Sequence, residues 1–208
     1  MAFTYFFRDI QTLDLIVEHV LPTLKGYRYI RIWDAGCAHG PEPYSLAIMM
    51  RENMSRFLFR NVHIHATDVS TQFGRSVTRG VFPDAEVKRV PMAIKRKYFT
   101  PADRPGHVRA IDEIRTSISF SRHDLRSFEP VRCGFGLIVC KNVLLHLTPE
   151  QRVKVVGMFH DALRDGGFLV MEQTQKLPAD AEHLFESLNC KARILRKVTI
   201  HAQERIAA

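Results

Sequence analysis

The sequence predicts an α/β fold in which helices cover both faces of a parallel sheet. Short β-rich apolar runs alternate with segments of helical periodicity along most of the chain. The run FGLIVC at 135–140 is typical of a strand buried on both faces. A length of 208 residues, 46% of them hydrophobic, suits one domain with a substantial core. We therefore expect a single domain over residues 1–208.

Helical and strand patterns follow each other in regular order through the first part of the chain. The expected elements are a helix at 11–25, a strand at 28–34, a helix from about 43 to 54, a strand at 63–67 and a helix from Ser70 to about Gly80. Gly26 ends the first of these helices, and Ser70 is a preferred N-cap residue for the last.

An insertion within the domain is expected at about 81–117, where this order breaks down. Prolines at 83, 91, 101 and 105 interrupt the segment, which predicts a short helix near 91–98 and a small β-hairpin near 107–119. Regular order then resumes. The further expected elements are a strand in SISFSRHDL (117–125), the strand at 135–140, a helix at 149–164 ended by Asp165-Gly166-Gly167, a strand in FLVMEQ (168–173), a helix at 179–188 and paired strands around 191–203.

Composition narrows the classes of function. No apolar run approaches the length of a membrane span, and MAFTYFFRDI does not read as a secretion signal, so a cytoplasmic protein is expected. The net charge of +8 favours acidic partners, although the positive residues are scattered. The four cysteines form no C-x-x-C pair and are interpreted as small buried hydrophobes. His63 and His65 face one side of a strand without acidic or thiol neighbours, so no metal site is predicted.

The stretch GCAHGPEPYS at 36–45 joins the first strand to the next helix. Gly36 and Gly40 allow a tight turn and a close approach of the backbone to a ligand. The pattern is neither G-x-G-x-x-G nor a P-loop. Taken alone, it fits an ordinary strand-to-helix turn as well as a loop opened for a nucleotide-like cofactor.

Other strand ends carry polar residues that would gather at the same edge of the sheet, where open α/β sheets bind ligands. Asp68 could accept hydrogen bonds from ribose hydroxyls, or it could cap the following helix. Asp124 with Leu125 could hold an adenine, or they could be a loop carboxylate and a core leucine. Lys141-Asn142 ends the next strand. Both interpretations stay open for each residue.

Taken together, these motifs resemble the CheR family, S-adenosylmethionine-dependent methyltransferases that modify receptor glutamates in bacterial chemotaxis. The family patterns T-x-F-F-R-[DE], G-C-S-T-G-E-E-P-Y-S, D-I/V, Y-F and C-R-N-V-x-x-Y-F have counterparts here, in the same order. These are TYFFRD at 4–9, GCAHGPEPYS at 36–45, TDVS at 67–70, KYF at 97–99 and CKNVLLHL at 140–147. The resemblance implies a class I, Rossmann-like methyltransferase sheet and S-adenosyl-L-methionine as cofactor, with S-adenosyl-L-homocysteine as product.

The resemblance also implies roles for individual residues. Those implied to bind the cofactor are Thr4, Arg8, Gly36, Glu42, Asp68, Asp124, Leu125 and Asn142. Arg8 would lie near the methionine part and the transferable methyl group, where its planar fork suits a carboxylate. Phe6 and Phe7 fit simple packing equally well.

Departures from the family pattern bear mainly on the substrate side. Ala38-His39 replaces Ser-Thr, Pro41 the first Glu, Lys141 the Arg and His146 the Tyr, and EQTQ at 172–175 stands where the family has G-H-S-E. The family usually begins with a helical domain, whereas this chain starts at TYFFRD. His146 could fill the space of the tyrosine, or it could act as a general base for an acceptor that must lose a proton.

The acceptor therefore stays open at this point. An acidic protein substrate with a glutamate acceptor, such as a chemoreceptor-like helix, is the first hypothesis. A methyltransferase acting on another residue or a small molecule, and a non-catalytic module that binds the cofactor and signals to a partner, are the alternatives. Nucleic acid ranks low as a substrate, because the sequence has neither an Asn/Asp-Pro-Pro-Tyr/Phe motif nor a concentrated basic helix.

Overall fold

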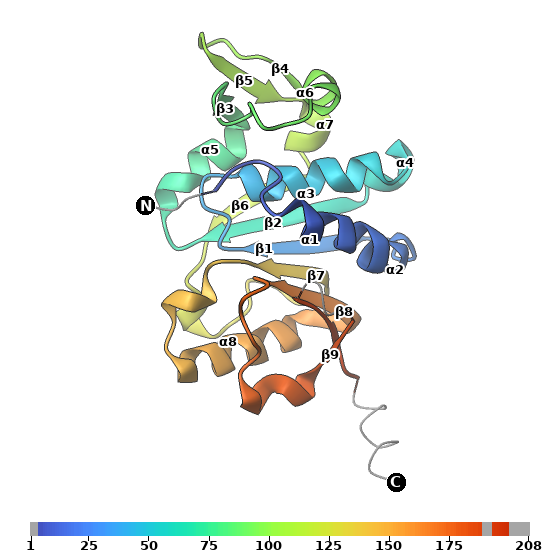
Figure 1. Ribbon diagram of the computed structural model, residues 1–208, viewed down its shortest axis with the longest axis vertical. Coiled ribbons are helices and arrows are strands. Elements are labelled where there is room, and N and C mark those ends of the chain that lie inside the picture. Colours follow the sequence, from blue (N-terminus) through green and yellow to red (C-terminus); the bar gives the residue numbers. More distant parts are fainter. Residues whose placement is uncertain (1–3, 189–192, 200–208) are drawn as a thin grey trace.

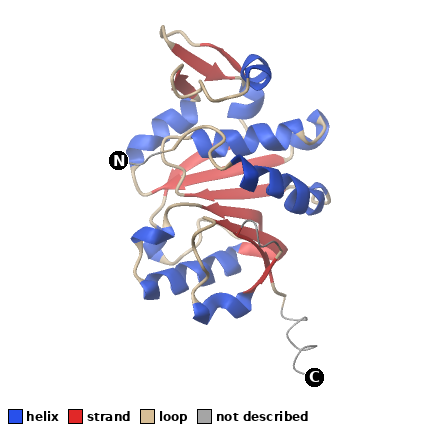
Figure 2. Ribbon diagram, in the orientation of Figure 1, coloured by secondary structure: helices blue, strands red, loops and turns tan. Residues whose placement is uncertain are grey.

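A computed structural model describes residues 4–188 and 193–199 of the chain. Its main sheet has seven strands in the order β6-β2-β1-β7-β8-β10-β9 (Figures 1 and 2). The strands are β1 Ile30–Ala35, β2 Val62–Asp68, β6 Ile118–Arg122, β7 Phe135–Cys140, β8 Leu163–Met171, β9 Phe185–Ser187 and β10 Arg193–Lys197. The first five in this order pair in parallel, whereas β10 runs antiparallel to β8 and β9. The α/β prediction is confirmed, with an antiparallel end added to the parallel sheet.

Helices pack on both faces of this sheet. They are α1 Ile10–Leu15, α2 Leu21–Lys25, α3 Pro41–Glu52, α4 Arg56–Phe59, α5 Gly74–Arg79 and α8 Pro149–Ala162. Two more helices, α6 Met92–Tyr98 and α7 Asp112–Arg115, lie towards the end of the molecule with the second, smaller sheet (Figure 1). Alternate residues of one strand point to opposite faces. Ile32 of β1 accordingly lies in one core cluster with residues of α3, while its neighbour Trp33 lies in a second cluster with residues of α8. Both side chains are fully buried.

A second, three-stranded sheet lies at one end of the molecule, beyond α3 and α5 (Figure 1). Its strands are β3 Val81–Pro83, β4 Phe99–Pro101 and β5 His107–Ala110, in the antiparallel order β3-β5-β4. Phe6 joins this small sheet to the N-terminal segment, because its buried ring packs edge-on against Phe82 and Phe99 at centroid distances of 4.9 and 5.4 Å.

Some expected elements have other boundaries or another type. The hairpin predicted near 107–119 is wrong, since β5 pairs with β3 and β4 while 118–122 joins the main sheet. The helix predicted at 179–188 is instead a 3-10 helix, Ala179–Leu184, followed by β9. The helix expected at 11–25 contains a π-helical turn at Ile16–Val20. Of the paired strands expected at 191–203, β10 is present, and residues 189–192 and 200–208 lie outside the described part.

Two other expectations concern the burial of the cysteines and the absence of membrane-spanning segments. Cys37 and Cys140 are buried, as predicted, whereas Cys133 is exposed and Cys190 lies outside the described residues. Within the described ranges, no helix combines the length and the apolar character that a bilayer crossing requires.

Candidate functional site

A cleft of about 580 Å³ opens at the carboxyl edge of the main sheet. Every residue that the resemblance implied for cofactor binding lines this one cleft, and so does His146. They are Thr4, Arg8, Gly36, Glu42, Asp68, Asp124, Leu125, Asn142 and His146. They come from the N-terminal segment and from the ends of β1, β2, β6 and β7, so that residues more than a hundred positions apart meet at one edge.

The loop between β1 and α3 forms one wall of the cleft through an unusual backbone path. Gly36 has a φ of +106° and Gly40, the N-cap of α3, a φ of +116°. A Cβ atom at position 36 would collide with the Val143 side chain, so a glycine is required where this loop crosses the segment after β7. The loop is tied to β2 by backbone N–H groups of Gly36 and Cys37, which both donate to Thr67 O at 2.8 and 2.9 Å.

Asp68 fixes the same loop from the end of β2. Its Oδ2 accepts a hydrogen bond from the Ala38 N–H at 3.1 Å, and its Oδ1 accepts one from the Ser70 N–H at 3.0 Å. Each carboxylate oxygen keeps a second lone pair for a ligand in the cleft. Asp68 thus both organises the turn before the next helix and lines the cleft, which brings the two interpretations of this residue together.

Arg8 is carried into the cleft by a strained N-terminal turn. Phe7 and Asp9 on either side of it have positive φ values of 55° and 57°. The Phe7 N–H donates to Ser45 Oγ at 2.8 Å, which anchors the turn to α3. The Arg8 guanidinium donates to Asn142 Oδ1 at 3.4 Å and so meets the loop after β7. TYFFRD therefore packs through Phe6 and at the same time delivers Arg8 to the cleft.

A buried group of charges at one side of the cleft was missed by the sequence reasoning. Lys141 is almost fully buried, and its Nζ lies 2.9 Å from Glu42 Oε1 and 3.9 Å from Asp9 Oδ2. Burial lowers the pKa of Lys141, but the Glu42 and Asp9 carboxylates outweigh it and raise that pKa. Burial, followed by repulsion from Glu42, raises the pKa of Asp34 well above its usual value. The sequence pattern did not single out Asp34.

Asp124 and Leu125 stand at the end of β6. The Asp124 carboxylate is clamped by Arg126, whose Nη2 lies 2.7 Å from Oδ2 and whose backbone N–H donates to Oδ1 at 2.9 Å. These hydrogen bonds lower the pKa of Asp124 to about 2, so the group is ionised at neutral pH. Leu125 is buried in the cluster with Trp33 and still lines the cleft, as does Arg126.

His146 lies at the mouth of the cleft in the 3-10 helix Leu144–His146 and is exposed. Two apolar residues of the cleft lining, Leu145 and Val69, are 47% and 50% exposed. The sequence reasoning did not include His123, which also lines the cleft. Burial lowers the pKa of His123, and its Nε2 is buried without a hydrogen-bond partner among the described residues.

A second hollow, of about 960 Å³, lies between α5 and the small sheet. We call it the arginine groove. Its basic lining residues are Arg75, Arg79, Arg104, His107, Arg109 and Arg115. Asp103 and Asp112 pair with Arg109 and Arg115, both at 2.9 Å. Within the described ranges, the other three arginines form no ion pair, so the groove carries an excess of positive charge.

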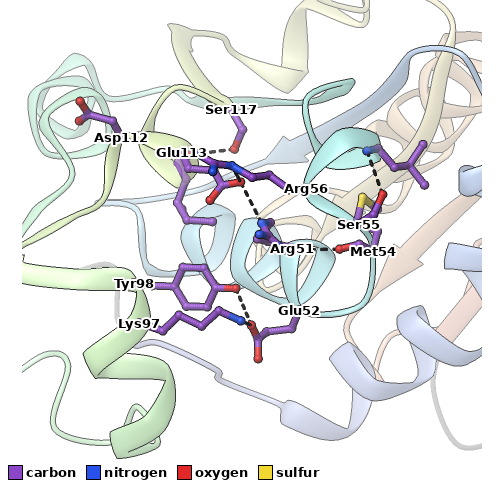
Figure 3. A network of polar contacts seen from close by, with 12 residues as sticks. Arg51, Glu52, Met54, Ser55, Arg56, Lys97, Tyr98, Asp112, Glu113 and Ser117 are labelled. Atoms are coloured by element: carbon purple, nitrogen blue, oxygen red, sulfur yellow. Dashed lines mark hydrogen bonds and ion pairs between the residues drawn. The ribbon is translucent and has the colours of Figure 1, made fainter.

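Helix α3 connects the cleft to the small sheet. It begins beside Glu42 in the cleft and ends at a network of polar contacts with α6 and α7 (Figure 3). Arg51 Nε donates to Glu113 Oε1 at 2.9 Å, and Glu52 accepts from both Lys97 and Tyr98. The insertion is therefore held to the end of α3 opposite the cleft.

Sequence comparison relates this architecture to one family. A model of the CheR methyltransferase SAM binding domain matches residues 2–194. Chemotaxis protein methyltransferase 2 of Vibrio cholerae is 32% identical over 180 residues, which are 84% of this chain and 62% of that protein. A chemotaxis protein methyltransferase of Listeria innocua is 31% identical over 186 residues, 88% of this chain and 69% of that protein. The chain thus covers 62% of the length of the Vibrio relative, which is less than two thirds, and 69% of the length of the Listeria relative.

Among solved structures, a similar fold occurs in the N-methyltransferase NodS from Bradyrhizobium japonicum in complex with S-adenosyl-L-homocysteine. The TM-score is 0.53 at 13% identity, over 92% of this chain and 88% of that one. At this identity the likeness concerns the fold, which is the predicted class I methyltransferase sheet.

Proposed function

Because the chain belongs to the CheR methyltransferase family, we propose that it transfers a methyl group from S-adenosylmethionine to a side-chain carboxylate of a protein, with glutamate as the acceptor. The observation that carries this proposal is the meeting of four strand ends and the TYFFRD segment in one cleft. Four of these five segments carry family motifs, and all five contribute residues to the lining of the same cleft. An accidental resemblance would not bring these motifs together in this way.

The cleft suits S-adenosylmethionine in size and in charge. Its volume of about 580 Å³ is in the range of small-molecule sites. We propose that the Glu42 carboxylate binds the ammonium group, that Arg8 binds the carboxylate group, and that Asp68 accepts hydrogen bonds from the ribose. Asp124 and Leu125 would hold the adenine, with Arg126 keeping the Asp124 carboxylate in place. Each pairing joins opposite charges or a donor to an acceptor.

S-adenosylmethionine, when bound, supplies a methyl group on a positively charged sulfur. A glutamate acceptor is already ionised near neutral pH, so the protein needs no base to activate it. Its task is to align the carboxylate and remove its water. Arg8, which holds the carboxylate of the cofactor, also adds positive charge near the transferable methyl group and so favours an anionic acceptor. The exposed apolar side chains of Val69 and Leu145, which line the cleft, exclude solvent when a substrate covers them.

The proposed substrate is an acidic segment of a protein, such as a chemoreceptor-like helix. The net charge of +8 and the excess of arginine in the arginine groove support an acidic partner. The groove adjoins α5, whose preceding turn contributes Phe73 to the cleft, so a bound acidic chain could extend from one hollow towards the other.

One observation favours a second candidate, a methyltransferase with a different acceptor. His146 is exposed at the mouth of the cleft, and among the described residues no hydrogen bond of its side chain is present. A free imidazole at this place could take the proton of a hydroxyl or amine acceptor.

One experiment distinguishes a carboxylate acceptor from a hydroxyl or amine acceptor. The release of S-adenosylhomocysteine is measured with acidic candidate proteins, and the methylated product is analysed by mass spectrometry. We expect an added methyl group that mild base removes, because esters hydrolyse in base. A base-stable adduct would favour the second candidate, and cofactor binding without any release would contradict both.

A further inference from the structure

Asp34 occupies a position where a charged carboxylate is costly. Its residue is 0% exposed, and neither carboxylate oxygen has a hydrogen-bond partner among the described residues. Burying an ionised carboxylate without hydrogen bonds costs several kcal/mol, on the order of the whole stability of a domain. A protonated, uncharged Asp34 would avoid most of this cost.

The charges around Asp34 reinforce this conclusion. Glu42 on α3 and Asp68 at the end of β2 repel a charge on Asp34, while Lys141 after β7 attracts one. Lys141 is in turn paired with Glu42 and faces Asp9 and Glu172. A single ammonium group therefore already serves several carboxylates, and it lies closest to Glu42.

We propose that Lys141 is a positioning residue that acts through Glu42 by holding the Glu42 carboxylate in place, and that the buried Asp34 stays an uncharged acid, so that it does not compete with Glu42 for the Lys141 ammonium group. This inference rests on the proposed function, because it takes Glu42 as the residue that binds the cofactor's ammonium group. The Glu42 side chain is 17% exposed and lines the cleft, whereas that of Lys141 is 4% exposed. The lysine therefore orients Glu42 from the protein interior.

The two residues differ in the property that a replacement must preserve. Lys141 acts by its charge, so Lys141→Arg should retain most of the cofactor affinity and Lys141→Met should lose about ten-fold or more, in line with a charge-assisted hydrogen bond. Asp34 acts as a neutral acid, so Asp34→Asn should bind S-adenosylmethionine within about three-fold of the wild type. A residue that merely filled space would not distinguish these replacements by charge.

A double-mutant cycle tests whether Lys141 acts through Glu42. S-adenosylmethionine affinity is measured by calorimetry for the wild type, Lys141→Met, Glu42→Gln and the double variant. We expect Lys141→Met to cost about ten-fold in the wild-type background and almost nothing beside Glu42→Gln. In turnover assays the loss should appear in KM for S-adenosylmethionine rather than in kcat.

Lys95→Met is the matched control, since Lys95 Nζ lies 3.4 Å from Asp84 on the surface of the small sheet, and its removal should leave the affinity unchanged. Melting curves establish that each variant is folded. If Lys141→Met does not fold, the Lys141→Arg and Asp34→Asn affinities still decide the matter.

Equal, additive losses in both backgrounds would overturn the role of Lys141. A ten-fold loss in Asp34→Asn would overturn the role of Asp34, because it would mean that the carboxylate charge is needed. A wild-type chain that binds no S-adenosylmethionine would overturn the proposed function and this inference together, whereas a binding wild type whose affinity is unchanged by Lys141→Met overturns the inference alone.

Discussion

Replacing Asp34 by Asn should make the protein increasingly more stable than the wild type as the pH rises. The folded-state pKa of Asp34 is raised by burial above its usual value of 3.8, and further by Glu42. A raised pKa contributes stability that is fully present below the unfolded pKa and is lost as the pH rises through the folded one. Asparagine has the same shape and no proton to lose, so the variant escapes this loss.

The expected magnitude follows from linkage. Each unit between the two pKa values corresponds to about 1.4 kcal/mol, so the free energy of unfolding of the wild type should fall by up to this amount per pH unit relative to Asp34→Asn. The fall begins near pH 4 and ends where folded Asp34 ionises. Any constant cost of placing an amide beside Glu42 shifts all points equally and leaves the slope unchanged.

Urea unfolding of both proteins at several pH values between 4 and 9 gives the difference directly. A difference that grows with pH and then levels off supports the assignment of a neutral Asp34. A difference independent of pH, or one that grows in favour of the wild type, would refute it, because Asp34 would then be ionised in the folded protein.

Three further predictions concern the cleft. Asp68→Ala should weaken binding of S-adenosylmethionine and S-adenosylhomocysteine by about ten- to a hundred-fold in calorimetry, since it removes an acceptor and frees the Ala38 N–H; unchanged affinity would contradict its role. Arg8→Ala should lower turnover far more than the melting temperature, and a parallel loss of both would make TYFFRD a packing segment only. If the acceptor is a carboxylate, the wild-type rate should be nearly independent of pH near neutrality and His146→Phe should change it little; a wild-type rate that rises with pH and falls by about 10²–10⁴ in His146→Phe would instead identify a general base.

The edge of the sheet could be predicted because each of its parts is local in sequence. A strand followed by GCAHG, or by Asp68, marks its own carboxyl end, and the parallel arrangement then brings these ends together. The position of these strand-end residues at one edge of the sheet therefore follows from the order of the strands and helices. Arg8 and His146 were assigned to the site by the resemblance to the CheR family instead, and both line the same cleft.

The charge cluster could not be predicted in this way. Asp34, Glu42 and Lys141 come from three different segments, and nothing in the sequence reveals that one ammonium group is shared among them. The arginine groove was missed for the same reason, because its arginines are spread over residues 75–115. The densest basic run of the sequence, Lys95–Lys97, lies outside the groove lining, and Lys95 and Lys97 are held in ion pairs.

The errors in secondary structure have a related cause. The segment 107–119 contains strand-like residues at both ends. Its first strand, however, pairs with two earlier segments, 81–83 and 99–101, and not with the later residues 118–122. At 179–188, helical periodicity covers only about two turns, and pairing of β9 with β10 takes over its second half.

Hydrogen exchange with and without S-adenosylmethionine tests the central claim most directly, because it locates the bound cofactor on the chain. We expect exchange to slow in the four segments that follow strands and line the cleft, 36–42, 67–73, 123–126 and 141–147, and to stay unchanged in α8, which packs on the opposite face of the sheet from α3. Slowing confined to the arginine groove, or absent from the loop after β1 at saturating cofactor, would contradict the account.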